Sequence, residues 1–122
     1  MTERELHQRY ERILAHALRS DDPVPVLRAC AQDAPEPLRS WLRAACARPA
    51  GLRLSALLCA RLRFERLIQG DARAAADYAD DPKRFAHAFR RYHREVAPSA
   101  HGPRAESQLF AAFRTRGPSA GE

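Results

Sequence analysis

Cysteine is scarce in this 122-residue chain, and its spacing excludes a disulfide framework. The three cysteines are Cys30, Cys46 and Cys59, and none belongs to a Cys-x-x-Cys pair. An odd number of thiols among alanines and leucines predicts small buried side chains in a reducing compartment. Long apolar runs are also missing, and no signal-peptide pattern opens the chain. We therefore expect a cytoplasmic protein with no membrane span.

Motifs that support catalysis or metal binding are missing as well. The five histidines form no His-Glu-x-x-His pattern and no set of three ligands at a suitable spacing. There is no Gly-x-Ser-x-Gly motif, and the five glycines are too scattered for a phosphate-binding loop. The paired carboxylates Asp21-Asp22 and Asp80-Asp81 stand beside prolines, where helix capping explains them. We predict that this chain is not an enzyme and that it holds no metal or cofactor.

Positive charge comes almost entirely from arginine, because Lys83 is the only lysine among the 21 basic residues. Arginine binds phosphate and carboxylate through paired hydrogen bonds, but a GC-rich genome also favours it. The net charge of +6 is unevenly spread, since basic segments at 39–66 and 83–96 flank an acidic connector at 71–81. A negatively charged partner would be attracted to the basic segments rather than to the whole surface.

Apolar residues recur at helical spacing along the chain, and no segment alternates like a strand. We predict an all-α, single-domain bundle of five to seven helices over 1–114, followed by a disordered tail at 115–122. The expected helices cover 3–19, 23–32, 38–48, 52–69, 71–78 and 82–97, and a last helix after Pro103 contains Leu109, Phe110 and Phe113. The helix at 52–69 is apolar over a wide arc, which predicts a central position, and Gly70 is expected to close it in the left-handed conformation. The predicted core contains Leu14, Trp41, Leu57, Phe64, Leu67, Phe85, Phe89, Tyr92, Phe110 and Phe113.

The segment at 81–98 gives the strongest helix signal and the best candidate surface for a partner. Asp81 is placed to cap a helix that begins at Pro82 and ends before Pro98. One face of this helix is apolar, and basic side chains surround that face. The candidate binding residues are Arg84, Arg90, Arg91, His93 and Arg94. They are compatible with a merely solvated basic face, a nucleic-acid-binding surface or a surface for a protein or peptide partner.

The region from about 54 to 113 resembles a family of helical domains that was first labelled DNA-binding. These domains were later described at the N-terminus of partner proteins in bufferin-type clusters. The matching residues are Phe64, Leu67, Gly70, Phe85, Tyr92, Pro98-Ser99, Phe110 and Phe113.

The resemblance implies an accessory role in ribosomal peptide modification in bacteria. Proteins of this family accompany multinuclear non-haem iron enzymes that oxidatively modify precursor peptides, and the partner protein itself carries no iron. The expected partners are therefore an iron enzyme, in a heterodimer, and the leader segment of a precursor peptide. Our first hypothesis is a non-catalytic partner subunit of this kind. The alternative is a small nucleic-acid-binding or regulatory protein that uses the same basic helix.

Overall fold

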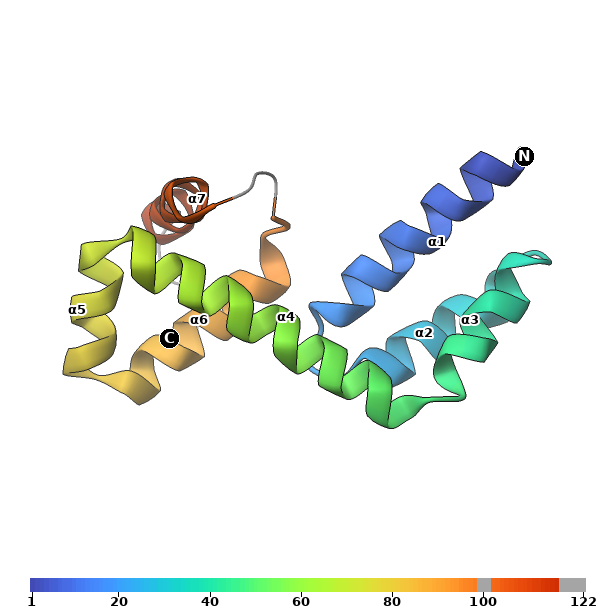
Figure 1. Cartoon of the computed structure of the whole chain (residues 1–122), viewed down its shortest axis with the longest axis horizontal. Coiled ribbons are helices and arrows are strands. Elements are labelled where there is room, and N and C mark those ends of the chain that lie inside the picture. The colour runs from blue at the N-terminus through green and yellow to red at the C-terminus, as the bar shows by residue number, and fades with distance from the viewer. Residues whose placement is uncertain (99–101, 117–122) are drawn as a thin grey trace. The chain divides into compact units, whose positions relative to one another are not determined.

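The computed structural model describes residues 1–98 and 102–116, which are all helical or connecting segments (Figure 1). Seven helices and no strand occur within these residues, so the all-α prediction is confirmed. None of these helices is both long enough and apolar enough to cross a membrane. The helices are α1 (Glu3–Leu18), α2 (Pro23–Asp33), α3 (Leu38–Cys46), α4 (Pro49–Gly70), α5 (Ala72–Asp80), α6 (Pro82–Glu95) and α7 (Pro103–Thr115).

The chain divides into two compact units, so the prediction of a single domain is not confirmed. Unit 1 comprises Met1–Cys59, and unit 2 comprises Ala60–Glu122. Each unit has its own cluster of buried apolar side chains, and α4 contributes residues to both units. Of the tail predicted at 115–122, Thr115 ends α7 and Arg116 follows it, while 117–122 lie outside the described residues.

Aspartates start several of the helices, as the sequence predicts. The side chains of Asp22, Asp71 and Asp81 accept hydrogen bonds from Val24 N at 3.1 Å, Ala74 N at 3.0 Å and Arg84 N at 3.2 Å. These bonds satisfy backbone N–H groups that have no partner within the first helical turn. The bond from Val24 N, together with Arg53 at 3.3 Å, lowers the pKa of the Asp22 carboxyl.

The core of unit 1 consists of small and aliphatic side chains from α1, α2 and α3. Its fully buried members are Ala17, Leu27, Leu38 and Leu42. The predicted core residues Leu14 and Trp41 are only partly buried at the border of this cluster. The Trp41 ring stacks on the exposed His7 ring with a centroid separation of 4.7 Å.

The core of unit 2 is aromatic and lies between α6 and α7. Phe85, Phe89, Tyr92 and Val96 are buried along one face of α6, as the helical spacing predicts. Tyr92 meets Phe110 edge to face at 5.0 Å, and Leu67 of α4 joins the same cluster. The predicted core residues Phe89, Phe110 and Phe113 are confirmed as buried, while Phe64 packs against the cluster and is partly exposed.

Helix α4 differs most from expectation. The prediction that Leu57 is a core residue is wrong, since its side chain is 64 % exposed. Leu54, Leu58 and Leu62 are also exposed, while Arg63 and Leu67 are the buried residues of this helix. The helix begins at Pro49 instead of 52, because proline is favoured in a first turn where its missing N–H costs nothing.

Gly70 and the three cysteines also differ from their predicted roles. Gly70 is not in the left-handed conformation, since Gly102 is the glycine with a positive φ in the described chain. A side chain at position 70 would instead come within 2.4 Å of the Pro103 carbonyl oxygen, so glycine permits close approach to α7. Cys59 is exposed and Cys30 and Cys46 are half-buried, which corrects the prediction of three buried thiols.

Candidate functional site

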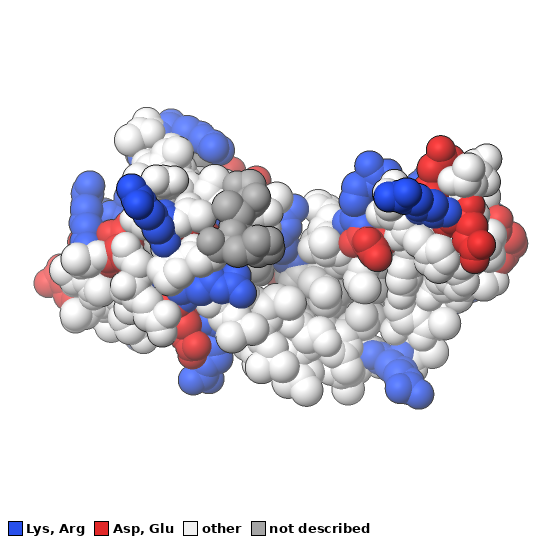
Figure 2. All heavy atoms as spheres, turned by 45° about the horizontal axis from the view of Figure 1, so that its top comes forward, with Lys and Arg blue, Asp and Glu red and all other residues white. Residues whose placement is uncertain are grey.

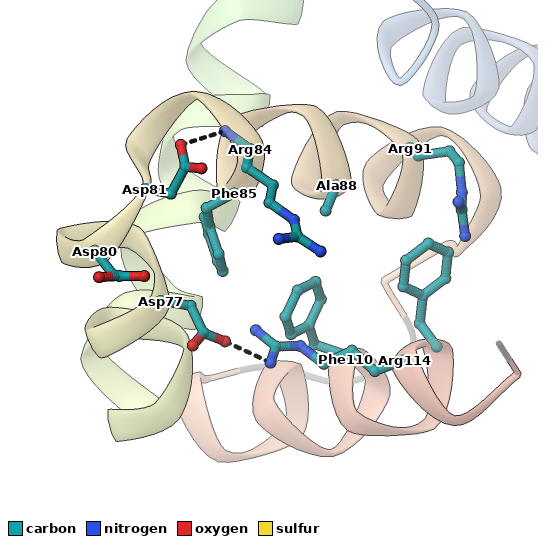
Figure 3. Close-up of a pocket in the computed structure, with 10 residues that line it drawn as sticks. Asp77, Asp80, Asp81, Arg84, Phe85, Ala88, Arg91, Phe110 and Arg114 are labelled. Atoms are coloured by element: carbon teal, nitrogen blue, oxygen red, sulfur yellow. Dashed lines mark hydrogen bonds and ion pairs between the residues drawn. The ribbon is translucent and has the colours of Figure 1, made fainter. Parts of the chain in front are cut away.

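A pocket of about 480 Å³ opens between α5, α6 and α7 of unit 2 (Figure 3). Its floor is apolar and is formed by Phe85, Ala88, Phe110 and Phe113. Three arginines and three aspartates complete the lining: Arg84, Arg91, Arg114, Asp77, Asp80 and Asp81. The pocket therefore combines an aromatic surface with charges of both signs, all within one unit.

The acidic side chains gather where α5 ends and α6 begins (Figure 3). Asp81 is committed to capping α6 through its bond to the Arg84 backbone. Asp77 accepts a hydrogen bond at 2.7 Å from Nη1 of Arg114, which reaches across from α7. Asp80 is exposed and has no ion pair within the part of the chain that the structure describes.

Two of the three arginines are held by carboxylates and by aromatic rings. Arg91 donates to Glu95 at 2.9 Å, and its guanidinium lies 4.7 Å from the centroid of the Phe113 ring. Arg114 pairs with Asp77, and its guanidinium lies 4.4 Å from the centroid of the Phe110 ring. Both charges are therefore largely neutralised by nearby carboxylates, and the stacked guanidinium groups cover the aromatic floor.

Arg84 is different from the other two arginines. Its backbone N–H is bonded to Asp81, but its guanidinium has no ion pair among residues 1–98 and 102–116. Figure 3 shows this side chain extending into the space between α6 and α7, above Phe110. Arg84 is thus the cation of the pocket that remains available to an incoming anion.

The predicted site residues fall on three sides of α6. Arg84 and Arg91 line the pocket, one helical repeat of seven residues apart. Arg90 and Arg94 are exposed with Lys83 and His87 along a separate strip, which we call the basic strip. His93 is only 7 % exposed, so it lies in the core of unit 2 and not on a binding surface with the arginines.

The pocket also contains charged residues that the sequence analysis did not name as binding residues, namely Asp77, Asp80 and Arg114. Asp77 and Arg114 are 37 residues apart in sequence, and only the packing of α5 against α7 brings them together. The spacing of Arg84, Ala88 and Arg91 on one helix face could have been read from the sequence. The residues that α5 and α7 contribute to the pocket could not have been predicted in this way.

A buried polar network joins α4, α6 and α7 within unit 2. Arg63 Nε donates to the two carboxylate oxygens of Glu106 at 2.9 and 3.1 Å, and both side chains are almost fully buried. The Tyr92 hydroxyl donates to Glu106, and the Arg63 guanidinium lies 4.3 Å from the centroid of the Tyr92 ring. Burial and the bond to Glu106 raise the pKa of the Tyr92 hydroxyl.

This network fixes the helices that carry the pocket. Arg63 also donates to the carbonyl oxygen of Val96 at the end of α6 and lies 3.3 Å from Nδ1 of His93. One side chain of α4 is thereby bonded to both α6 and α7, which present the aromatic floor. The network is a positioning element, since its members do not line the pocket.

Residues 1–98 and 102–116 contain no group of three histidine, cysteine or acidic side chains placed to hold a metal ion. No protein-family model, curated protein or solved structure matches this chain. On the face that Figure 2 shows, blue and red side chains are intermixed over unit 2 and do not form a continuous field of one sign.

Proposed function

We propose that this protein is a non-catalytic binding subunit that holds a peptide segment of another molecule in the pocket of unit 2. The observation that carries the proposal is the unpaired guanidinium of Arg84 in a pocket whose aromatic floor is covered by two stacked guanidinium groups. An apolar floor with a few well-placed polar groups is typical of a ligand site. A peptide supplies both an apolar side chain for the floor and a charged group for Arg84.

A binding subunit can assist a reaction that another protein catalyses. Holding a substrate segment away from the reacting atoms raises its effective concentration at the partner's active site. Such a role needs a recognition surface and no catalytic group, and the pocket supplies the surface.

The resemblance noted above supports a more specific form of the proposal. Phe85, Tyr92, Phe110 and Phe113 carry that resemblance, and all four are buried in the core of unit 2. We propose that the peptide is the leader segment of a ribosomally made precursor. The partner would be a multinuclear non-haem iron enzyme that modifies it, and the iron would belong to that enzyme.

Affinity purification of the tagged full-length protein from its native host tests this form directly. We expect a stoichiometric enzyme to co-purify, and iron to be measurable in the eluate by mass spectrometry. The variant Arg84→Glu should lose any co-purifying precursor peptide, while Arg90→Glu on the basic strip should retain it. Recovery of nucleic acid without a stoichiometric protein would contradict the proposal.

The basic strip supports the second candidate function, which is nucleic-acid binding. Lys83, His87, Arg90 and Arg94 are all exposed on α6 and lie apart from the carboxylates of the pocket. Phosphate contacts of this kind weaken steeply as salt increases. Retention of wild-type protein on DNA that falls with salt and is lost in Arg90→Glu, but not in Arg84→Glu, would favour this candidate.

A further inference from the structure

Some of the arginines that line the pocket already have a carboxylate partner, and one does not. This difference limits the charge that a ligand can carry. Arg114 is paired with Asp77 at 2.7 Å, and Arg91 is paired with Glu95 at 2.9 Å. Arg84 has no such partner among the described residues. The pocket therefore offers one free guanidinium group, which matches one carboxylate through two parallel hydrogen bonds.

The acidic end of the pocket disfavours a second negative charge nearby. Asp77, Asp80 and Asp81 all line the pocket, and Figure 3 shows them at the end formed by α5 and the start of α6. Like charges brought together inside a partly enclosed site repel each other, so a run of acidic residues would be opposed there. Asp80, whose carboxylate has no ion pair in the described chain, would instead attract a ligand cation.

The floor of the pocket sets a third requirement for the ligand. Phe85 and Phe110 are only 4 % and 1 % exposed, so the flat surface open to a ligand is the Arg114 guanidinium, which lies 4.4 Å from the centroid of the Phe110 ring and belongs to a side chain that is 24 % exposed. A flat aromatic side chain can stack on such a surface, while a sugar-phosphate backbone gains little from it. Arg84 and Arg114 line the same pocket, and Figure 3 shows their side chains extending into it from α6 and α7, so we expect the carboxylate and the ring to belong to neighbouring residues of the ligand.

We infer that the pocket binds a peptide segment in which one acidic residue is adjacent to an aromatic residue, with a basic residue on the side facing Asp80, and that it rejects polyacidic tracts. This inference rests on the proposed function and names the class of peptide for that site. The acidic side chain pairs with Arg84, the ring stacks on the Arg114 guanidinium that covers Phe110, and the basic side chain lies near Asp80.

NMR titration of the full-length protein with synthetic peptides tests the inference. The reference probe is acetyl-Lys-Gly-Phe-Glu-amide, and the comparison probes replace Glu by Gln, replace Phe by Ala, or are hexaglutamate. We expect the Glu-to-Gln and Phe-to-Ala peptides each to bind about tenfold more weakly than the reference. Shifts on addition of the reference should concentrate at amides of 80–91 and 110–114.

Two arginine variants on the same helix separate the pocket from general charge. Arg84→Gln should weaken binding of the reference about tenfold, while Arg90→Gln should leave it unchanged because Arg90 does not line the pocket. The charge-reversed variant Arg84→Glu should prefer acetyl-Lys-Gly-Phe-Lys-amide over the reference. This reversal would not follow from damage to the fold, and unchanged circular dichroism would confirm that each variant is folded.

The results also distinguish this inference from the proposed function. Tighter binding of hexaglutamate than of the reference, equal binding of the Glu and Gln peptides, or no binding of any peptide would overturn the inference. Co-purification of an iron enzyme could still succeed in those cases. Conversely, selective binding of the reference together with no co-purifying enzyme would leave the inference standing and overturn the iron-enzyme partnership.

Discussion

Arg63 and Glu106 form a buried ion pair that is more important for stability than the exposed pairs around it. Removing one partner of such a pair leaves the other charge buried without compensation, which costs about 3–5 kcal/mol. We expect Glu106→Gln to lower the free energy of unfolding by about this amount, measured by urea denaturation at neutral pH. The hydrogen bond from Tyr92 would be weakened by the same change.

A matched control lies on the same helix as Arg63. Arg61 pairs with Glu65 at 3.3 Å, but the two side chains are 75 % and 50 % exposed. Exposed pairs contribute about 0–1 kcal/mol, so Glu65→Gln should have little effect on unfolding. Similar losses in Glu106→Gln and Glu65→Gln would show that the buried network does not stabilise unit 2.

Tyr92 should make unit 2 sensitive to alkaline pH. The pKa of its hydroxyl is raised above the ordinary value of 10.0 by burial and by Glu106, so the folded protein keeps the proton after the unfolded chain has lost it. This contribution to stability is complete below pH 10 and falls as pH rises above it. Denaturation midpoints measured from pH 8 to 11.5 should decline in the wild type and decline less in Tyr92→Phe. Parallel curves for the two proteins would contradict this assignment.

At the scale of the helix, α4 shows that an apolar side chain is not necessarily a buried one. Leu57 is 64 % exposed, and Leu67 on the same helix is fully buried. Leucine-to-alanine changes at buried sites cost about 2–5 kcal/mol, while exposed substitutions usually change stability by less than about 0.5 kcal/mol. We expect Leu67→Ala to fall in the first range and Leu57→Ala in the second, as measured by chemical denaturation. A large loss in Leu57→Ala would restore the sequence-based expectation.

Helix boundaries were largely predictable because they depend on local chemistry. An aspartate followed directly by proline fixes the starts of α2 and α6, and Asp71 alone starts α5. The buried face of each helix was harder to predict. The sequence of α4 has apolar residues on several sides, and the choice of Arg63 as a buried residue depends on Glu106, 43 positions away.

At the scale of the whole chain, each unit has a separate apolar cluster. A substitution in one cluster should therefore lower local stability mainly in its own unit. Leu38 belongs to the cluster of unit 1, and Leu67 belongs to the cluster of unit 2. We expect Leu38→Ala to accelerate amide hydrogen exchange mainly in α2, and Leu67→Ala to accelerate it mainly in α6. Equal acceleration in both helices for either variant would indicate that the two clusters unfold together.

The candidate site could be predicted from the sequence only in part, for a related reason. Arg84 and Arg91 could be predicted as neighbours because they share a face of one helix. Asp77 and Arg114 belong to α5 and α7, and nothing in their local sequence marks them as neighbours. His93 resembled its basic neighbours in sequence, but its place on the helix turns it toward Arg63 and the core.

The ion pairs at Arg91 and Arg114 also affect how quickly a ligand could leave. Both side chains are already held by a carboxylate and an aromatic ring, so binding does not need to order them. Only Arg84 among the three must lose rotational freedom, and ordering one long side chain costs about 0.5–1.5 kcal/mol. A preformed site that binds its ligand through one charge favours rapid ligand exchange over a long residence time. Short residence would suit the peptide-binding subunit that we propose, because such a subunit must release one peptide before it binds the next.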